Sequence, residues 1–156
     1  MGGPLKDVER IISDERPRIM RYSCSAGPVR SKFLICLRDQ KKILGTRCPS
    51  CGRVYVPATP SCPKCFENTK EWIEVGDEGI LETYTIVYKS EPIHIAEVPF
   101  AFGIIKLDGA DIGMVHRLGE VDFEKINIGM RVKAVFNDER KGDITDIKYF
   151  KPVNSN

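Results

Sequence analysis

Four cysteines arranged as two Cys-x-x-Cys pairs constrain the fold of this chain more than any other feature of its sequence. The pairs are Cys48-Pro49-Ser50-Cys51 and Cys62-Pro63-Lys64-Cys65, with ten residues between them. Each pair can turn two thiolates to one side of a tight turn, and two facing turns place four sulfurs tetrahedrally at about 2.3 Å from a zinc ion. Because four sulfur ligands leave no open coordination position, the site is predicted to be structural rather than catalytic.

Zinc is the predicted occupant of this site. In a chain without an export signal the cysteines are kept reduced, so metal binding is favoured over a disulfide framework. Iron, as in rubredoxin, is the alternative metal, because spacing alone does not separate the two. The remaining cysteines, Cys24 and Cys36, lie in a Ser-Cys-Ser loop and in an apolar run, and neither is predicted to be catalytic.

The segment between the cysteine pairs is predicted to form part of a zinc ribbon. Residues 54–56 (Val-Tyr-Val) indicate a short strand, and Pro57 and Pro60 a rigid return. Gly52 follows the first pair, where glycine can adopt a positive φ at little cost, whereas Phe66 occupies the matching position after the second pair. We therefore expect a less regular second turn.

Two short amphipathic helices are predicted before the ribbon. Apolar residues at helical spacing indicate a helix over residues 5–15, which ends before Pro17. A second helix is expected from Ser31 to about Gln40, with an apolar face that contains Phe33 and Leu37. Both helices could pack on the ribbon or dock on a partner protein.

After Trp72 the sequence changes to short β-rich runs separated by turn residues. Asp108-Gly109 indicates a hairpin turn, and Asp122 could cap a short helix over residues 122–126. Five strands with a helix between the third and fourth follow the order of an OB-fold, whereas a β-sandwich would want about seven strands. The predicted strands are Ile80–Tyr88, Phe100–Leu107, Ile112–Leu118, Arg131–Phe136 and Ile144–Phe150.

These patterns predict a mainly β protein with an α-helical amino-terminal part. We divide the chain into amino-terminal helices at residues 1–41, a rubredoxin-like zinc ribbon at 42–71 and an OB-fold barrel at 72–156.

The charge is unevenly distributed along the chain, although the net charge is only +2. Residues 1–47 carry 11 Lys and Arg against 5 Asp and Glu, whereas residues 71–156 carry 10 Lys and Arg against 16 Asp and Glu. No apolar run approaches the ~20 residues that span a bilayer, and the first ten residues lack an apolar signal region, so we expect a cytoplasmic protein.

The ordered motifs resemble a known family, the acyl-CoA-associated OB-fold proteins with a rubredoxin-like zinc ribbon, known as domain of unknown function thirty-five. The resemblance covers roughly residues 31–150. Phe66 departs from the glycine usual in that family. The motifs that carry the resemblance are residues 47–52 (Arg-Cys-Pro-Ser-Cys-Gly), Pro57 and Pro60, residues 62–65, Gly79, residues 82–85 (Glu-Thr-Tyr-Thr), the strand at 100–107 and residues 128–132 (Ile-Gly-Met-Arg-Val).

The resemblance implies an accessory role without catalysis. Proteins of this family are companions of thiolase-fold enzymes, and in archaea they bridge acetoacetyl-CoA thiolase and hydroxymethylglutaryl-CoA synthase of the mevalonate route and help to enclose the CoA arm. The sequence agrees in one respect, since it has no Ser-His-acid set, no phosphate-binding loop and only two histidines, His94 and His116. His116 alternates with Met114 and Leu118, which is typical of a hydrogen-bonded core histidine.

A site for CoA would combine cationic groups for its phosphates with an apolar slot for its pantetheine arm. Arg47, Arg53 and Arg117 are the candidate acyl-CoA-binding residues, and ordinary surface charge is the other interpretation of them. The aromatic candidates for the slot, Tyr55, Tyr84 and Phe100, are more simply core residues.

Two other functions fit parts of the sequence. Zinc ribbons and OB barrels also bind single-stranded nucleic acid, but the acidic barrel segment argues against this function. A rubredoxin-like electron carrier would need iron in the four-cysteine site. We therefore favour a zinc-containing, acyl-CoA-binding scaffold subunit.

Overall fold

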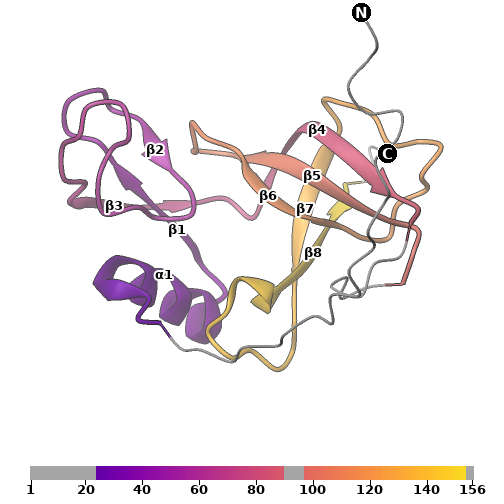
Figure 1. Ribbon diagram of the computed structural model, residues 1–156, viewed down its shortest axis with the longest axis horizontal. Coiled ribbons are helices and arrows are strands. Elements are labelled where there is room, and N and C mark those ends of the chain that lie inside the picture. Colours follow the sequence, from indigo (N-terminus) through magenta and orange to yellow (C-terminus); the bar gives the residue numbers. More distant parts are fainter. Residues whose placement is uncertain (1–23, 90–96, 154–156) are drawn as a thin grey trace, which may run out of the picture.

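The computed structural model describes residues 24–89 and 97–153. Within these ranges the chain forms a helix, then a three-stranded sheet, then a closed five-stranded barrel (Figure 1). The predicted fold class, mainly β with a ribbon before an OB-fold barrel, is confirmed. The predicted helix at residues 5–15 and His94 lie outside the described residues. None of the helices in the described ranges is long and apolar enough to cross a membrane.

Helix α1, Gly27–Gln40, packs against the first strand of the ribbon. It begins before the predicted start at Ser31, because Pro28 suits the first turn of a helix, where its missing N–H would have no partner. It ends at Lys41, whose φ of 55° is left-handed and whose N–H donates to Leu37 O at 3.2 Å. The predicted apolar residues Phe33 and Leu37 are both buried.

The ribbon sheet consists of β1 (Ile43–Arg47), β2 (Val54–Tyr55) and β3 (Glu71–Val75), in the order β2-β1-β3 with antiparallel pairing throughout. Gly45 lies in the central strand at a close approach, since a Cβ there would be 2.9 Å from Tyr55 O. Only β2 was expected from the sequence. Strand β3 pairs with β1 along its whole length, so the hydrogen bonding of the ribbon continues to Val75.

The barrel closes in the order β4-β5-β6-β8-β7. Its strands are β4 (Glu78–Val87), β5 (Phe100–Leu107), β6 (Met114–Leu118), β7 (Arg131–Phe136) and β8 (Ile147–Pro152). Neighbouring strands are antiparallel except β6 and β8, which close the barrel in parallel. The predicted turn at Asp108-Gly109 is present, with Ala110 N–H donating to Leu107 O at 2.9 Å and Gly109 at a φ of 90°.

The helix predicted over residues 122–126 is wrong. Asp122 does accept a hydrogen bond from Glu124 N–H at 3.1 Å, as a helix cap would, but the chain makes only one turn, closed by Lys125 N–H to Asp122 O at 2.9 Å. Five residues rarely sustain a helix, because its first turn fixes several dihedral angles for a single hydrogen bond. Burial of Ile126 instead holds the segment against the barrel.

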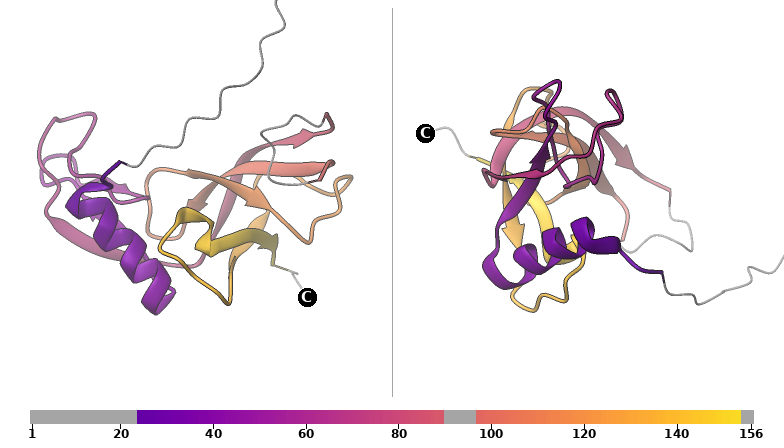
Figure 2. Two further views of the ribbon diagram at one scale, coloured as in Figure 1. Left: turned by 60° about the horizontal axis from the view of Figure 1, so that its bottom comes forward. Right: turned by 90° about the vertical axis from the view of Figure 1, so that its left-hand side faces the viewer.

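The last predicted strand, residues 144–150, starts later than expected. Ile144–Asp146 form a 3-10 turn, which Asp143 caps by accepting the Thr145 N–H at 2.9 Å, and β8 begins only at Ile147. Figure 1 and Figure 2 show α1 and the ribbon sheet side by side at one end of the barrel. The helix, ribbon and barrel share a hydrophobic core. It includes Phe33 from α1, Ile43 and Val75 from the ribbon, and Leu81 and Ile105 from the barrel.

Candidate metal centre

The four cysteines of the two pairs converge at one end of the ribbon. Their Sγ atoms all lie within 4.8 Å of one another, and Cys51 Sγ is 3.8 Å from Cys62 Sγ. A tetrahedron with zinc–sulfur bonds of 2.3 Å has edges of about 3.8 Å, so the spacing fits a zinc ion. Cys48 and Cys62 are buried, and Cys51 and Cys65 are half-buried. The predicted ligand set, Cys48, Cys51, Cys62 and Cys65, is thus brought together in the arrangement of a structural zinc site.

The first turn of the centre is built by backbone hydrogen bonds around Cys48. The Cys48 N–H donates to Arg53 O at 2.9 Å, and the Cys48 carbonyl accepts the Gly52 N–H at 3.0 Å. The Cys51 N–H points at Cys48 Sγ, 3.5 Å away. Gly52 has a φ of 74°, in the left-handed region that glycine adopts without strain.

The second turn repeats these contacts around Cys62. Its N–H donates to Glu67 O at 2.8 Å, its carbonyl accepts the Phe66 N–H at 2.8 Å, and the Cys65 N–H lies 3.4 Å from Cys62 Sγ. Phe66 has a φ of 59°, so it adopts the glycine-type conformation of Gly52. The expectation of a less regular second turn is therefore wrong, because the backbone geometry that directs both sulfurs to one metal overrides the preference of the residue at this position.

Tyr55, which the sequence predicts more simply as a core residue than as part of an apolar slot, contacts one of the metal ligands. Its hydroxyl is buried with Cys62 and donates to Cys62 Sγ at 3.1 Å. The hydrogen bond to Cys62 and burial raise the pKa of Tyr55 to about 12. Burial opposes ionisation of Cys62, but the hydrogen bonds from Tyr55 and from the N–H groups of Cys65 and Lys64 outweigh it and lower the pKa of Cys62 to about 6. Such partners orient metal ligands and tune their basicity.

A buried threonine fixes the loop that joins the two turns. Thr46 on β1 is fully buried, and its hydroxyl donates to Thr59 O at 2.9 Å while it accepts the Thr59 N–H at 3.0 Å. Thr69 donates a further hydrogen bond to the same carbonyl. The loop is thereby held to the central strand β1 and to the segment that precedes β3.

The loop between β5 and β6 clamps the ribbon to the barrel. Asp111 accepts the Val54 N–H with Oδ2 at 2.8 Å, and its own N–H donates to Val54 O at 3.0 Å. Gly76, which follows β3, donates its N–H to Asp108 O at 3.0 Å. These residues are far apart in sequence, so the contacts fix how the ribbon is oriented on the barrel.

An ion-pair cluster supports the same loop. The Arg131 guanidinium makes a two-pronged contact with the Asp108 carboxylate, with Nη1–Oδ1 at 2.8 Å and Nη2–Oδ2 at 2.6 Å. This contact holds the pKa of Asp108 below its usual value. Glu78 lies 3.3 Å from Arg131 and 3.1 Å from Lys133, and these hydrogen bonds lower its pKa as well.

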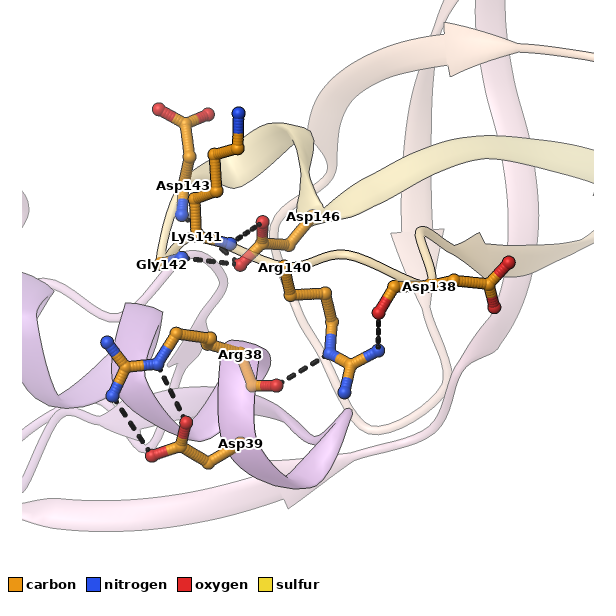
Figure 3. Close-up of polar contacts among 8 residues, drawn as sticks. All are labelled: Arg38, Asp39, Asp138, Arg140, Lys141, Gly142, Asp143 and Asp146. Atoms are coloured by element: carbon orange, nitrogen blue, oxygen red, sulfur yellow. Dashed lines mark hydrogen bonds and ion pairs between the residues drawn. The ribbon is translucent and has the colours of Figure 1, made fainter.

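A second clamp joins the helix to the barrel, as Figure 3 shows. Arg140, in the loop between β7 and β8, donates from Nε to Arg38 O near the end of α1 at 2.6 Å and from Nη1 to Asn137 O at 2.9 Å. The carboxylate of Asp146, which is buried, shapes this loop by accepting the N–H groups of Lys141 and Gly142, each at 2.8 Å.

The three arginines predicted to bind acyl-CoA do not form one cluster. Arg47 is the last residue of β1 and is exposed, with its Nη1 3.6 Å from Glu71 Oε1. It pairs with Val54 on β2, and the exposed Arg53 directly precedes Val54 in the sequence. Arg117 is exposed on β6 opposite Phe102, towards the end of the barrel that is remote from the ribbon contacts at Asp108 and Asp111. The structure thus brings Arg47 and Arg53 near each other and separates Arg117 from them, and their role in binding stays a prediction.

The aromatic slot is not assembled either. Tyr55 is buried at the metal centre, whereas Tyr84 on β4 is half-buried and Phe100 on β5 is buried against the barrel, edge to face with Phe102.

His116 is a buried core histidine, as its alternation predicted. It packs edge to face on Phe150, its Nε2 is 3.3 Å from Ile144 O, and burial lowers its pKa.

Comparison with known proteins matches both modules. The family model described as the ChsH2 rubredoxin-like zinc ribbon domain matches residues 37–70, and that described as the ChsH2 C-terminal OB-fold domain matches residues 72–137. A DUF35 domain-containing scaffold protein of Methanocaldococcus jannaschii is 33% identical over 123 residues, which are 75% of this chain and 86% of the relative. A scaffold protein of the same description from Methanothermobacter thermautotrophicus is 28% identical, over 70% of this chain and 86% of the relative.

Two solved structures share the fold. A protein of unknown function from the DUF35 family of Sulfolobus solfataricus superposes with a TM-score of 0.57 at 27% identity, over 70% of this chain and 78% of that chain. A chain of the Ltp2-ChsH2(DUF35) aldolase superposes with a TM-score of 0.58 at 22% identity, over 88% of this chain and 98% of that chain. The fold of this chain is therefore shared with two solved chains that are both described as DUF35.

Proposed function

Because this chain belongs to the DUF35 family, we propose that it is an accessory subunit without catalytic activity, which holds a thiolase-fold enzyme and contributes to the binding of acyl-CoA. The observation that carries the proposal is the match to relatives described as scaffold proteins, which extends over most of their length. The fold neighbour in the Ltp2-ChsH2(DUF35) aldolase supports a partner, because there a chain of this fold accompanies a second protein.

The arrangement of titratable groups supports a role without catalysis. Among the described residues, the four-cysteine cluster is the group of His, Cys, Asp and Glu side chains placed to hold a metal. A four-thiolate zinc site leaves no position for a substrate or a reactive water. The histidine within the described ranges, His116, is turned into the barrel core towards a backbone carbonyl. The thiolates need a reducing environment, so we propose that the protein works in the cytoplasm.

For the ligand, we propose that Arg47 and Arg53 meet the phosphates of CoA and that Arg117 makes a separate contact from the barrel. Guanidinium groups bind phosphate oxygens in a two-pronged manner, and both ribbon arginines are exposed. The distance of Arg117 from the ribbon favours an extended ligand, or a site completed by the partner enzyme.

Co-purification followed by calorimetry tests the proposal. We expect the tagged full-length chain to bring down a thiolase-fold enzyme, and the isolated complex to bind acetyl-CoA. The double variant Arg47→Ser/Arg53→Ser should weaken acetyl-CoA binding, whereas Lys125→Ser, which removes an exposed cation paired with Asp122, should not. Repeated isolation without such an enzyme, or salt-sensitive binding of single-stranded oligonucleotides at sub-micromolar concentration, would contradict the proposal.

A further inference from the structure

Phe66 combines an exposed aromatic ring with a left-handed backbone conformation, and the fold needs the conformation but not the ring. Its side chain is 86% exposed, the largest exposed fraction among the large apolar side chains of the described ranges. Its backbone has a φ of 59°, in the left-handed region where a Cβ atom is strained. Residues in strained backbone conformations cluster at sites that contact a ligand or another molecule, and an exposed aromatic ring can fill a pocket in another protein.

The first turn of the metal centre shows that glycine would serve the fold at this position. Gly52 holds the same place after Cys51 that Phe66 holds after Cys65, with matching hydrogen bonds and a φ of 74°. Both positions face open space, since a Cβ at Gly52 would meet nothing within 4 Å and the Phe66 ring lies in solvent. Neither packing nor the metal therefore explains the ring.

The position of the ring makes it accessible to another protein. The two cysteine turns form the end of the ribbon that points away from the barrel (Figure 1). Along the chain the ring is flanked by an exposed cation, Lys64, and an exposed carboxylate, Glu67. A surface that complements it would have an apolar pocket for the ring with polar groups at its rim.

We propose that Phe66 anchors this chain to its enzyme partner by inserting its ring into an apolar pocket with a polar rim. This inference rests on the proposed function and adds the contact point. Aromatic side chains that fill a pocket at the centre of an interface carry a large share of the binding energy, and surrounding charges steer the encounter. A single ring favours a pocket in a protein over a nucleic-acid strand, which needs a series of stacking aromatics along a basic groove.

Binding of the full-length chain to the thiolase-fold enzyme that co-purifies with it, measured by calorimetry, tests the anchor. Phe66→Asn and Phe66→Gly remove the ring but keep residues that tolerate a left-handed backbone, so zinc content and thermal stability should be retained. We expect both variants to raise the Kd at least about tenfold, and Phe66→Tyr to leave it within about threefold. The matched control is Ile128→Ser on the barrel, because Ile128 is 65% exposed and should not contribute.

The outcomes separate this inference from the proposed function. If the wild-type chain binds the enzyme and Phe66→Asn binds equally well, the anchor is refuted while the accessory role stands. If the wild-type chain binds no thiolase-fold enzyme, the proposed function fails and the anchor with it. Loss of oligonucleotide binding in Phe66→Asn, with enzyme binding unchanged, would also overturn the anchor and assign the ring to base stacking.

Discussion

We predict that the hydrogen bond from Tyr55 to Cys62 contributes measurably to the affinity of the four-cysteine site for zinc. In Tyr55→Phe the ring remains in its buried place, and only the hydroxyl that lies 3.1 Å from Cys62 Sγ is removed. Removing a group that is hydrogen-bonded to a metal ligand typically lowers the metal affinity about ten- to a hundredfold. We therefore expect the zinc Kd of Tyr55→Phe to rise by about that factor.

The same change predicts a shift in the pH at which zinc is released. A thiol must lose its proton to bind zinc, and the Tyr55 hydroxyl helps to hold the pKa of Cys62 at about 6. Without the hydroxyl that pKa rises, so protons compete with the metal at higher pH. We therefore expect the midpoint of zinc release in a downward pH titration to move to higher pH in Tyr55→Phe.

Competition with a chromophoric zinc chelator measures the zinc affinity of the protein at neutral pH. The absorbance of the chelator–zinc complex also follows the release of zinc as the pH falls. Tyr84→Phe is the matched control, because Tyr84 is a half-buried tyrosine of the barrel. A zinc affinity and a release midpoint equal to those of the wild-type chain would refute the view that Tyr55 stabilises the Cys62 thiolate.

Three further predictions concern the packing. Asp111→Ala removes the acceptor of the Val54 N–H and should lower the free energy of unfolding in urea by about 1 kcal/mol with zinc content intact; no change would deny the clamp. Thr46→Val leaves the buried Thr59 N–H without its acceptor and should cost about 1–3 kcal/mol, whereas Thr46→Ser keeps the acceptor and should cost less; equal losses would contradict this. Burial lowers the pKa of His116, so the unfolded state takes up its proton first and stability should fall as the pH drops below about 6.5; His116→Leu should lose this part of the pH dependence, and an unaltered profile would argue against it.

Features that depend on residues close in sequence were predicted from the sequence. The four zinc ligands follow from two local turns, and β5 and β7 have the predicted bounds, Phe100–Leu107 and Arg131–Phe136, because apolar residues and turn signals mark both strands. The start of α1 lies before the predicted Ser31, because the helix begins at Gly27 and Pro28 is suited to a first helical turn.

Features that depend on distant residues were not predictable from the sequence. Strands β1 and β3 pair along their whole length although they are separated in the sequence by β2 and both cysteine turns. The contact between Asp111 and Val54 joins positions 57 residues apart, and that between Arg140 and Arg38 joins positions 102 residues apart. No local pattern indicates which of several exposed acidic or basic side chains will find a partner at such separations.

The two clamps fix the orientation of the ribbon on the barrel. The connection between β3 and β4 is Gly76-Asp77, a short link that alone would leave the ribbon free to change its angle. The clamp at Asp111 holds β2 to the barrel, and the clamp at Arg140 holds the end of α1 to another barrel loop. Because α1 also packs on β1, the ribbon is fixed from two sides. If an enzyme binds at the metal end of the ribbon, as we propose, it is held in one orientation to the barrel surface that carries Arg117, and no binding energy is spent on ordering a hinge.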